Sequence, residues 1–298
     1  MDTSYKQILV IINPASGQPQ PVLHTLNKVF SEHETVDWDI RITQNTGDGQ
    51  RLASEAAAAG IDVVAVCGGD GTVMEVASGL VNTSTPLMLL PGGTNNVLAA
   101  EFNVPLTLEE AARQIFQRVP QPADVGQVGE QYFMLRAEIG LNAKVNENTT
   151  RELKDQYGPL AYAIGALRAL GQSVRTRYRL TVDGEQIEVE GINCDIVNAS
   201  RLNSATGLTY SLSVTADDGL LDVFILDNSP NSVGAALSRL LKLDESWGVY
   251  HWQGREIHVE TDEAQNIWCD GEPCGSTPAV IRAVPGAIQI LRLPEPTP

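Results

Sequence analysis

The chain has 298 residues, 43% of them hydrophobic and 19% charged, a length and balance typical of one large or two ordinary folded domains. Its net charge of −17 argues against a nucleic-acid partner, because nucleic acids bind to basic surfaces. The same charge argues against passive adhesion to an anionic membrane. The N-terminus has no secretory signal design and no apolar run is long enough to span a membrane, so a cytoplasmic protein is expected.

The first half of the chain alternates predicted strands with predicted helices. Apolar runs predict strands at 7–12, 36–43, 63–67 and 86–90. Apolar residues at helical spacing predict helices at 22–30, 52–59, 73–80 and 106–119, and a short one ending at Phe102. This alternation indicates a parallel α/β sheet, whose ligands bind at the carboxyl ends of its strands.

A polar or glycine-rich turn follows each of these strands. These turns contain Asn13, Thr43, Gly68-Gly69-Asp70-Gly71-Thr72 and Gly92-Gly93-Thr94-Asn95-Asn96. Because the carboxyl ends of parallel strands meet at one edge of a sheet, we expect the four turns to converge there.

The turn at 68–72 joins a buried strand to the start of a helix. Its glycines allow another group to approach the backbone, and the helix start offers free N–H groups, so the turn suits a phosphate. It is neither a Walker A loop, because no Lys-Ser or Lys-Thr pair follows, nor a dinucleotide G-x-G-x-x-G. Taken alone, it is also typical of an ordinary tight turn in an α/β domain.

The composition changes after Pro120-Gln121-Pro122, and most later segments have strand character. Predicted strands lie at 131–139, 177–182, 186–189, 192–199, 220–226, 256–261 and 287–293, with helical patches at 150–170 and 233–241. We therefore predict an α/β domain at 1–125 and a β-rich domain at 126–298. Whether the last strand returns to the first domain stays open.

The four cysteines, Cys67, Cys194, Cys269 and Cys274, form no C-x-x-C pair, and the four histidines are scattered. We therefore expect neither a zinc-type cluster nor a disulfide framework, which fits a reducing cytosol.

Six motifs in order carry a resemblance to a known family. They are Asn13-Pro14-x-Ser16-Gly17, Gly68-Gly69-Asp70-Gly71-Thr72, Pro91-Gly92-Gly93-Thr94-x-Asn96-x-x-Ala99, Gly158-x-Leu160-Ala161-Tyr162, Asp217-Asp218-Gly219-Leu220-Leu221-Asp222-Val223 and Asp270-Gly271-Glu272. With them the chain resembles the diacylglycerol kinase catalytic family, which includes bacterial lipid kinases and sphingosine or ceramide kinases.

The resemblance implies a parallel α/β nucleotide-binding domain of the NAD kinase and diacylglycerol kinase type, followed by an antiparallel β-sandwich. It also implies transfer of the γ-phosphoryl group of ATP, with Mg²⁺, to a hydroxyl of a diacylglycerol-like or sphingoid lipid. The expected partner is thus a lipid at a membrane surface, reached from the cytoplasmic face; no nucleic acid is expected, and a homodimer stays open.

Nucleotide binding is expected at ten residues, nine of them in motifs of the resemblance and Thr43 because it follows a strand at the same sheet edge: Asn13, Thr43, Gly68, Gly69, Asp70, Gly71, Thr72, Gly93, Thr94 and Asn96. Since no lysine lies in the glycine loops, Mg²⁺ must neutralise much of the phosphate charge, and Asp70 is the candidate to hold it. A helix-capping role for Asp70 is the alternative.

The substrate hydroxyl needs a general base. The family pattern points to the turn Asp270-Gly271-Glu272, and we favour Asp270 as the base with Glu272 orienting it, the reverse being open. The alternative is an Asp-Gly hairpin turn with solvated carboxylates.

Two further features have competing interpretations. Asp218, with the carbonyls of Thr215 and Leu220, resembles a structural Mg²⁺ site of bacterial family members, or else begins an ordinary β-turn. Four arginines, Arg168, Arg175, Arg177 and Arg179, follow or end an apolar segment and suit either a bilayer surface or a solvated edge strand.

The match is incomplete at Val97 and Asn142, where many family members carry an Asp. The lipid therefore stays unassigned. Two alternatives stay open: a relative that binds nucleotide or lipid without transfer, and a soluble small-molecule kinase similar to NAD kinase.

Overall fold

The computed structural model describes residues 5–17, 21–94, 96–140, 175–199, 214–226 and 249–294. The chain forms two compact units, one of Met1–Asp124 with Pro285–Pro298 and one of Val125–Val284. The helical patches predicted at 150–170 and 233–241 lie outside the described residues. Within the described ranges, no helix has both the length and the apolar character to cross a membrane.

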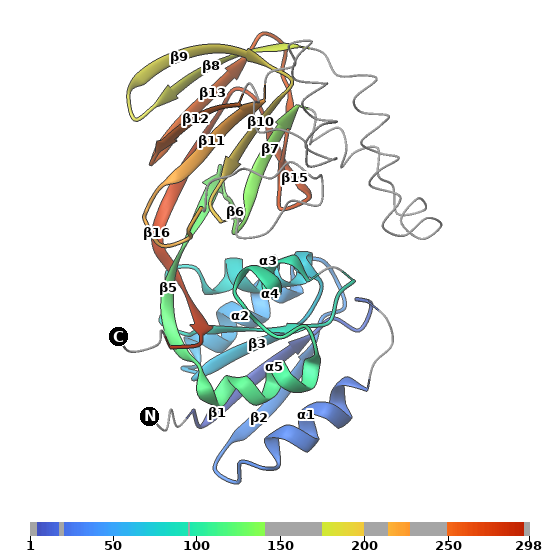
Figure 1. Ribbon diagram of the computed structural model, residues 1–298. Helices are drawn as coiled ribbons and strands as arrows, with labels where there is room; N and C mark the ends of the chain where they lie inside the picture. Colours follow the sequence, from blue (N-terminus) through green and yellow to red (C-terminus); the bar gives the residue numbers. More distant parts are fainter. Residues whose placement is uncertain are drawn as a thin grey trace, which may run out of the picture. The chain divides into compact units, whose positions relative to one another are not determined.

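The first unit is built on a sheet whose strands run in the order β2-β1-β3-β4-β16 (Figure 1). The strands are β1 (Gln7–Ile12), β2 (Asp37–Ile42), β3 (Val63–Gly68), β4 (Leu87–Pro91) and β16 (Ala279–Arg292). All neighbours in this order pair in parallel. Every residue of β3 and β4 is buried, which explains why both read as continuous apolar runs.

Helices cover both faces of this sheet. They are α1 (Val22–Phe30), α2 (Asp48–Ala58), α3 (Asp70–Leu80), α4 (Val97–Glu101) and α5 (Leu108–Gln114), the last continued by the 3-10 turn η1 (Ile115–Gln117). α1 packs with α5, and α2 packs with α3 on the opposite side of the sheet (Figure 1). The α2–α3 contact is close because a Cβ at Gly79 would lie 2.3 Å from the Gln50 carbonyl oxygen.

Several helix boundaries differ from those predicted, such as the start of α3 at Asp70 rather than at 73. α2 begins at Asp48 rather than at 52, because the Asp48 carboxylate accepts the N–H groups of Gln44 and Asn45 and so orders the turn before the helix. The helix predicted over 106–119 ends at Gln114, and its last residue, Val119, already belongs to strand β5.

The described residues of the second unit form strands in two layers. The strands are β5 (Val119–Val128), β6 (Gln131–Phe133), β7 (Arg136–Gly140), β8 (Thr176–Val182), β9 (Glu185–Gly191), β10 (Asn193–Val197), β11 (Leu221–Leu226), β12 (Val249–Gly254), β13 (Glu256–Thr261), β14 (Asn266–Cys269) and β15 (Glu272–Ser276). One layer has the order β16-β13-β8-β9 and the other β12-β11-β10-β7-β14-β15. The pairs within both layers are antiparallel.

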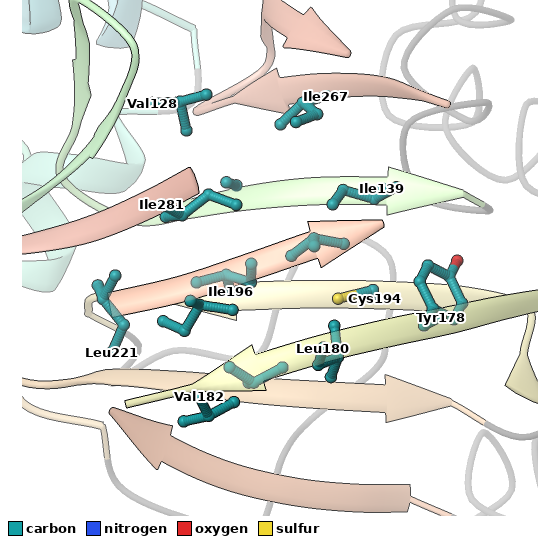
Figure 2. Close-up of a cluster of buried hydrophobic side chains, with 14 of the residues drawn as sticks. Val128, Ile139, Tyr178, Leu180, Val182, Cys194, Ile196, Leu221, Ile267 and Ile281 are labelled. Atoms are coloured by element: carbon teal, nitrogen blue, oxygen red, sulfur yellow. The ribbon is translucent and has the colours of Figure 1, made fainter. Parts of the chain in front are cut away.

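An apolar core lies between these two layers (Figure 2). Tyr178, Leu180 and Val182 project from one layer, and Cys194 and Ile196 project from the other. Alternate residues of a strand share a face, so each layer turns one apolar face to this core, and the unit is a β-sandwich. In β10 and β11 every residue is buried, so there both faces of the layer are covered. The predicted fold class, a parallel α/β domain followed by an antiparallel β-sandwich, is confirmed.

Several strands differ from the predicted ones. The strand predicted over 131–139 is divided into β6 and β7 at Met134 and Leu135. Strand β5 runs through Pro120 and Pro122, which the composition marked as a boundary. Strands β12, β14 and β15 were not predicted, and β16 begins at Ala279 rather than at 287.

Candidate active site

The loops that follow β1 and β3 are joined by side-chain hydrogen bonds. The Asn13 side-chain amide donates to Thr72 Oγ1 over 2.8 Å, and the Gly69 N–H donates to Ser16 Oγ over 3.2 Å. The backbone N–H of Asn13 donates to the Cys67 carbonyl at 3.0 Å. Ser16 was in the first motif but not among the predicted site residues, and its place in a turn after a strand was the available signal.

The loop that follows β4 packs directly on the other two. A Cβ on Gly17 would lie 2.2 Å from the Gly92 oxygen, and one on Gly93 would lie 2.5 Å from the Gly69 Cα. Asn96 holds this loop in shape, since its side chain accepts the Gly93 N–H at 2.8 Å and donates to the Gly93 carbonyl at 2.9 Å. Three of the four turns that were predicted to converge therefore meet at the carboxyl ends of their strands.

Thr43 and Thr94 lie at the same edge in different surroundings. Thr43 is buried beside the end of β1, where its N–H donates to the Ile12 carbonyl at 3.0 Å and its hydroxyl lies 3.5 Å from the same oxygen. Thr94 is exposed on the glycine loop. Thr94 is thus the more accessible hydroxyl of the two.

The N-terminus of α3 opens at this convergence. Its first helical hydrogen bond runs from the Val73 N–H to the Gly69 carbonyl at 3.0 Å, so the N–H groups of residues 70–72 precede the helical ladder. A Cβ placed on Gly71 would meet nothing within 4 Å, and Gly71 is exposed. Free N–H groups, the positive end of the helix dipole and open space make this turn suitable for an anion.

Asp70 connects two of the loops. Its Oδ1 accepts the Leu98 N–H at 3.0 Å, in the first turn of α4. Asp70 therefore acts as a helix cap, as the alternative interpretation holds. It caps α4, however, and not α3, the helix that Asp70 itself begins. Val97, where many family members carry Asp, is the first residue of α4.

Asp270 belongs to the second unit and forms a tight turn with Gly271 between β14 and β15. Both residues have positive φ, 49° and 89° respectively, as in a two-residue hairpin turn. The Asp270 carboxylate accepts three successive backbone N–H groups, those of Met134, Leu135 and Arg136, at 2.7, 3.0 and 2.8 Å. These bonds account for the break between β6 and β7.

Burial raises the pKa of Asp270 to about 6, although the same three N–H groups favour its charged form and hold the pKa down. Glu272, two residues later, is exposed at the start of β15 and lies opposite Cys269 in the ladder. The two carboxylates of the motif are thus unequal: that of Asp270 is half-buried against the backbone, and that of Glu272 is accessible.

The expectation of no disulfide is wrong for the Asp270 turn. Cys269 and Cys274 are bonded, with their Cα atoms 5.7 Å apart, while Cys67 and Cys194 are free and buried. The physical reason is an irregularity in the hairpin. Pro273 pairs with Trp268 and Gly275 with Ile267, so Cys274 is the extra residue between them and lies within disulfide range of Cys269. A Cys pair flanking an Asp-Gly turn was the signal available in the sequence.

Asp218 lies in an exposed turn before β11. Its Oδ1 accepts the Leu220 N–H at 2.9 Å, and Gly219 has a φ of +75°. This is the geometry of the β-turn alternative. In the described part of the chain, no three His, Cys, Asp or Glu side chains form a group that could hold a metal, but the predicted site would use carbonyl oxygens for two of its ligands.

Three of the four arginines form ion pairs on the exposed face of β8 and its neighbours. Arg175 and Arg177 pair with Glu190 at 3.2 and 3.5 Å, and Arg179 pairs with Asp262 at 2.6 Å. These contacts favour the solvated-strand interpretation over the bilayer one. Arg168, the 158–162 motif and Asn142 lie outside the described residues.

Comparisons with known proteins match the two domains in their order along the chain. Residues 7–128 match the model of the diacylglycerol kinase catalytic domain, and residues 136–292 match the YegS C-terminal NAD kinase beta sandwich-like domain. The Pseudomonas putida protein named "Probable lipid kinase YegS-like" is 33% identical over 267 residues, which cover 87% of this chain and 86% of that protein.

Solved structures show the same relationship. A diacylglycerol kinase from Bacillus anthracis is similar with a TM-score of 0.79 and 28% identity, over 98% of this chain and 99% of that one. Yeast NADH kinase shares the fold with a TM-score of 0.53 at 11% identity, over 98% of this chain and 85% of that one. The chain therefore belongs to the family of lipid kinases that combine a diacylglycerol kinase catalytic domain with a YegS-type C-terminal domain.

Proposed function

We propose that this chain transfers the γ-phosphoryl group of ATP to a hydroxyl of a diacylglycerol-like or sphingoid lipid. The observation that carries the proposal is the convergence of three polar or glycine-rich loops at the N-terminus of α3. Phosphoryl transfer depends on positioning and charge stabilisation more than on covalent chemistry. We therefore expect preorganised N–H groups to contribute much of the catalysis.

The nucleotide phosphates would bind along the first turn of α3. Its N–H groups are available, Gly71 leaves open space above them, and the exposed Thr94 lies on the loop that packs against Gly69. Bound Mg²⁺ would neutralise phosphate charge there, and Asp70 would hold it, with its Oδ1 already fixed by the Leu98 N–H. The donor chemistry fits, since hard cations take carboxylate oxygens.

For the general base we propose Glu272, with Asp270 as a positioning residue, which reverses the assignment favoured from the sequence. The Asp270 carboxylate already accepts three backbone N–H groups, so its lone pairs are committed to holding the turn. Glu272 is exposed and close enough along the chain to be oriented by that turn. A base must be able to reach the proton that it accepts.

A second Mg²⁺ at Thr215, Asp218 and Leu220 would have a structural role. The oxygen donors there, one carboxylate and two carbonyls, suit a hard cation, and the turn already orders Asp218 through the Leu220 N–H. The lipid acceptor rests on the family and on the printed names of relatives, which do not distinguish diacylglycerol from sphingoid lipids.

The test is transfer of labelled phosphate from ATP, with Mg²⁺, to detergent-dispersed diacylglycerol, monoacylglycerol, sphingosine, ceramide and undecaprenol, with NAD as a soluble acceptor. Glu272→Gln should lower the transfer rate by roughly a hundredfold or more while thermal stability and ATP binding stay unchanged. Asp270→Asn should lower both transfer and stability, because an amide cannot accept all three N–H groups.

The results separate the alternatives. Full activity of Glu272→Gln would overturn the assignment of the base. Labelling of NAD alone would indicate a soluble small-molecule kinase, and binding of ATP without any labelled product would indicate a relative that has lost transfer.

A further inference from the structure

The turn that carries Glu272 is anchored directly on its β14 side by Asp270, whereas on the β15 side the next anchor is Thr277, whose N–H donates to the Gln265 carbonyl at 2.9 Å. Asp270 ties the end of β14 to the backbone of residues 134–136. β14 is further held by its ladder with β7. The position of Glu272 therefore depends on how firmly β15 is held to β14.

Several features of β15 weaken its attachment to the sheet. It is the last strand of its sheet, and four of its five residues are exposed. Pro273 has no N–H to give to the ladder, and Gly275 has a φ of +145°, which adds conformational freedom. The β14–β15 pairing also shifts register between Ile267 and Trp268.

The disulfide supplies the covalent link between these two strands. Cys269 ends β14 and Cys274 is the middle residue of β15, so the bond encloses Asp270, Gly271, Glu272 and Pro273. Cys269 is 6% exposed and Cys274 is half-buried, so a thiol reaches the Cys274 sulfur more easily. The bond thus joins a buried, well-anchored cysteine to one on the weak edge strand.

We propose that the Cys269–Cys274 pair is a reversible redox switch that sets the activity of the turn between them, active when oxidised. The proposal rests on the proposed function, because Glu272 is the group whose position the bond controls. In the disulfide form β15 is held against β14 and Glu272 keeps one position. In the dithiol form β15 frays from the edge of the sheet and Glu272 loses that position.

The redox step requires a dithiol as the electron donor. A thiolate of the donor attacks Cys274 Sγ and forms a mixed disulfide, and Cys269 leaves as a thiolate that takes up a proton. The second thiol of the donor then displaces Cys274, which also leaves as a thiol. Two electrons and two protons have moved to the protein, and the donor is released as a disulfide; oxidised glutathione reverses the reaction and leaves as two thiols.

The experiment compares purified full-length protein as isolated, after dithiothreitol, and after reoxidation with glutathione disulfide. Alkylation under denaturing conditions should label two cysteines before reduction and four after it. The lipid transfer rate should fall roughly tenfold or more on reduction and return on reoxidation, since small misplacements of a catalytic group are costly. Amide hydrogen exchange at residues 272–276 should become faster in the same step.

Variants identify the sulfurs responsible. Cys269→Ser/Cys274→Ser should have the transfer rate of the reduced protein and no response to dithiothreitol. Cys194→Ala is the matched control, because Cys194 is a free cysteine of the same unit that is buried in the sandwich core, and this variant should respond as the wild type does.

The proposal is overturned if four cysteines are labelled before reduction, or if complete reduction changes neither the transfer rate nor the exchange at 272–276. If no acceptor is phosphorylated in either redox state, the proposed function fails, and the exchange rates alone decide whether the bond controls the turn.

Discussion

Asp270 and Glu272 are two residues apart, yet their surroundings are opposite. The Asp270 carboxylate accepts N–H groups that begin at Met134, 136 positions earlier in the chain. Nothing in the local motif indicates that contact, so the sequence could identify the Asp-Gly-Glu turn but not divide the roles within it. The structure supplies the missing long-range partner and makes Glu272 the accessible carboxylate.

The raised pKa of Asp270 has a measurable consequence for stability. Because the folded-state pKa is about 6 and the ordinary value is 3.8, the folded protein binds more protons than the unfolded chain between these pH values. The stability contributed by the protonated carboxyl is fully present below pH 3.8 and is lost as the pH rises through 6. Between pH 5 and pH 7 the free energy of unfolding should therefore fall by about 1 kcal/mol through this group.

The measurement is denaturant unfolding of the wild type and of Asp270→Asn at pH 5, 6 and 7. The variant cannot titrate at this position, so the wild type's stability advantage over it should shrink by that amount as the pH rises. A difference between the two proteins that is the same at all three pH values would contradict the raised pKa. Asn27→Ala serves as the control, since Asn27 is exposed on α1 and the change removes no titratable group.

At the scale of elements, a substitution in the first turn of α3 should affect folding stability and ligand affinity in opposite directions. Gly71 has a helical backbone and open space where a Cβ would lie, so Gly71→Ala should stabilise the folded protein by roughly 0.5–1 kcal/mol through helix propensity. The same methyl group would occupy the space proposed for phosphate. We therefore expect a higher melting temperature together with an ATP affinity that is lower by about tenfold or more.

Calorimetry of unfolding and of ATP binding would check this pair of opposite effects. Asn27→Ala is the matched control, because Asn27 is exposed on α1 and the change improves helix propensity away from the glycine loops. It should raise stability and leave ATP affinity unchanged. An unchanged ATP affinity in Gly71→Ala would argue against phosphate binding at the first turn of α3.

Elements with a strong local pattern were predicted best. β1 and α1 have the predicted bounds, because a continuous apolar run and a clear helical spacing leave little choice. β5 and β15 were not predicted, because each contains proline and gains its strand geometry from a neighbouring strand. The break after β6 likewise depends on Asp270, which no local pattern near residue 134 reveals.

The arginines of β8 show a second limit of local patterns. Alternate residues of a strand share a face, so Arg177 and Arg179 gather on one side and look like a basic stripe in the sequence. Their partners, Glu190 and Asp262, come from two neighbouring strand regions and balance that charge. A basic stripe read from one strand is therefore not evidence of a basic surface until its neighbours are known.

At the scale of the whole molecule, the net charge of −17 opposes the approach to an anionic bilayer that a lipid kinase would make. The fold class followed from the sequence because it depends on the order of elements, which the alternation in the first half and the strands in the second half express. Association with a membrane depends instead on how charge is distributed over the surface, which the net charge describes only on average.

We expect the protein to bind vesicles of phosphatidylcholine alone more strongly than vesicles that also contain phosphatidylglycerol, when both carry diacylglycerol. The difference should be largest at low salt and should shrink between about 0.01 M and 0.15 M, as the Debye length shortens from roughly 30 Å to roughly 8 Å. Co-sedimentation across this salt range would measure it, with the neutral vesicles as the control for salt effects on the protein itself. Stronger binding to the anionic vesicles at low salt would mean that a locally basic surface outweighs the net charge of −17, and that the lipid is approached through that surface.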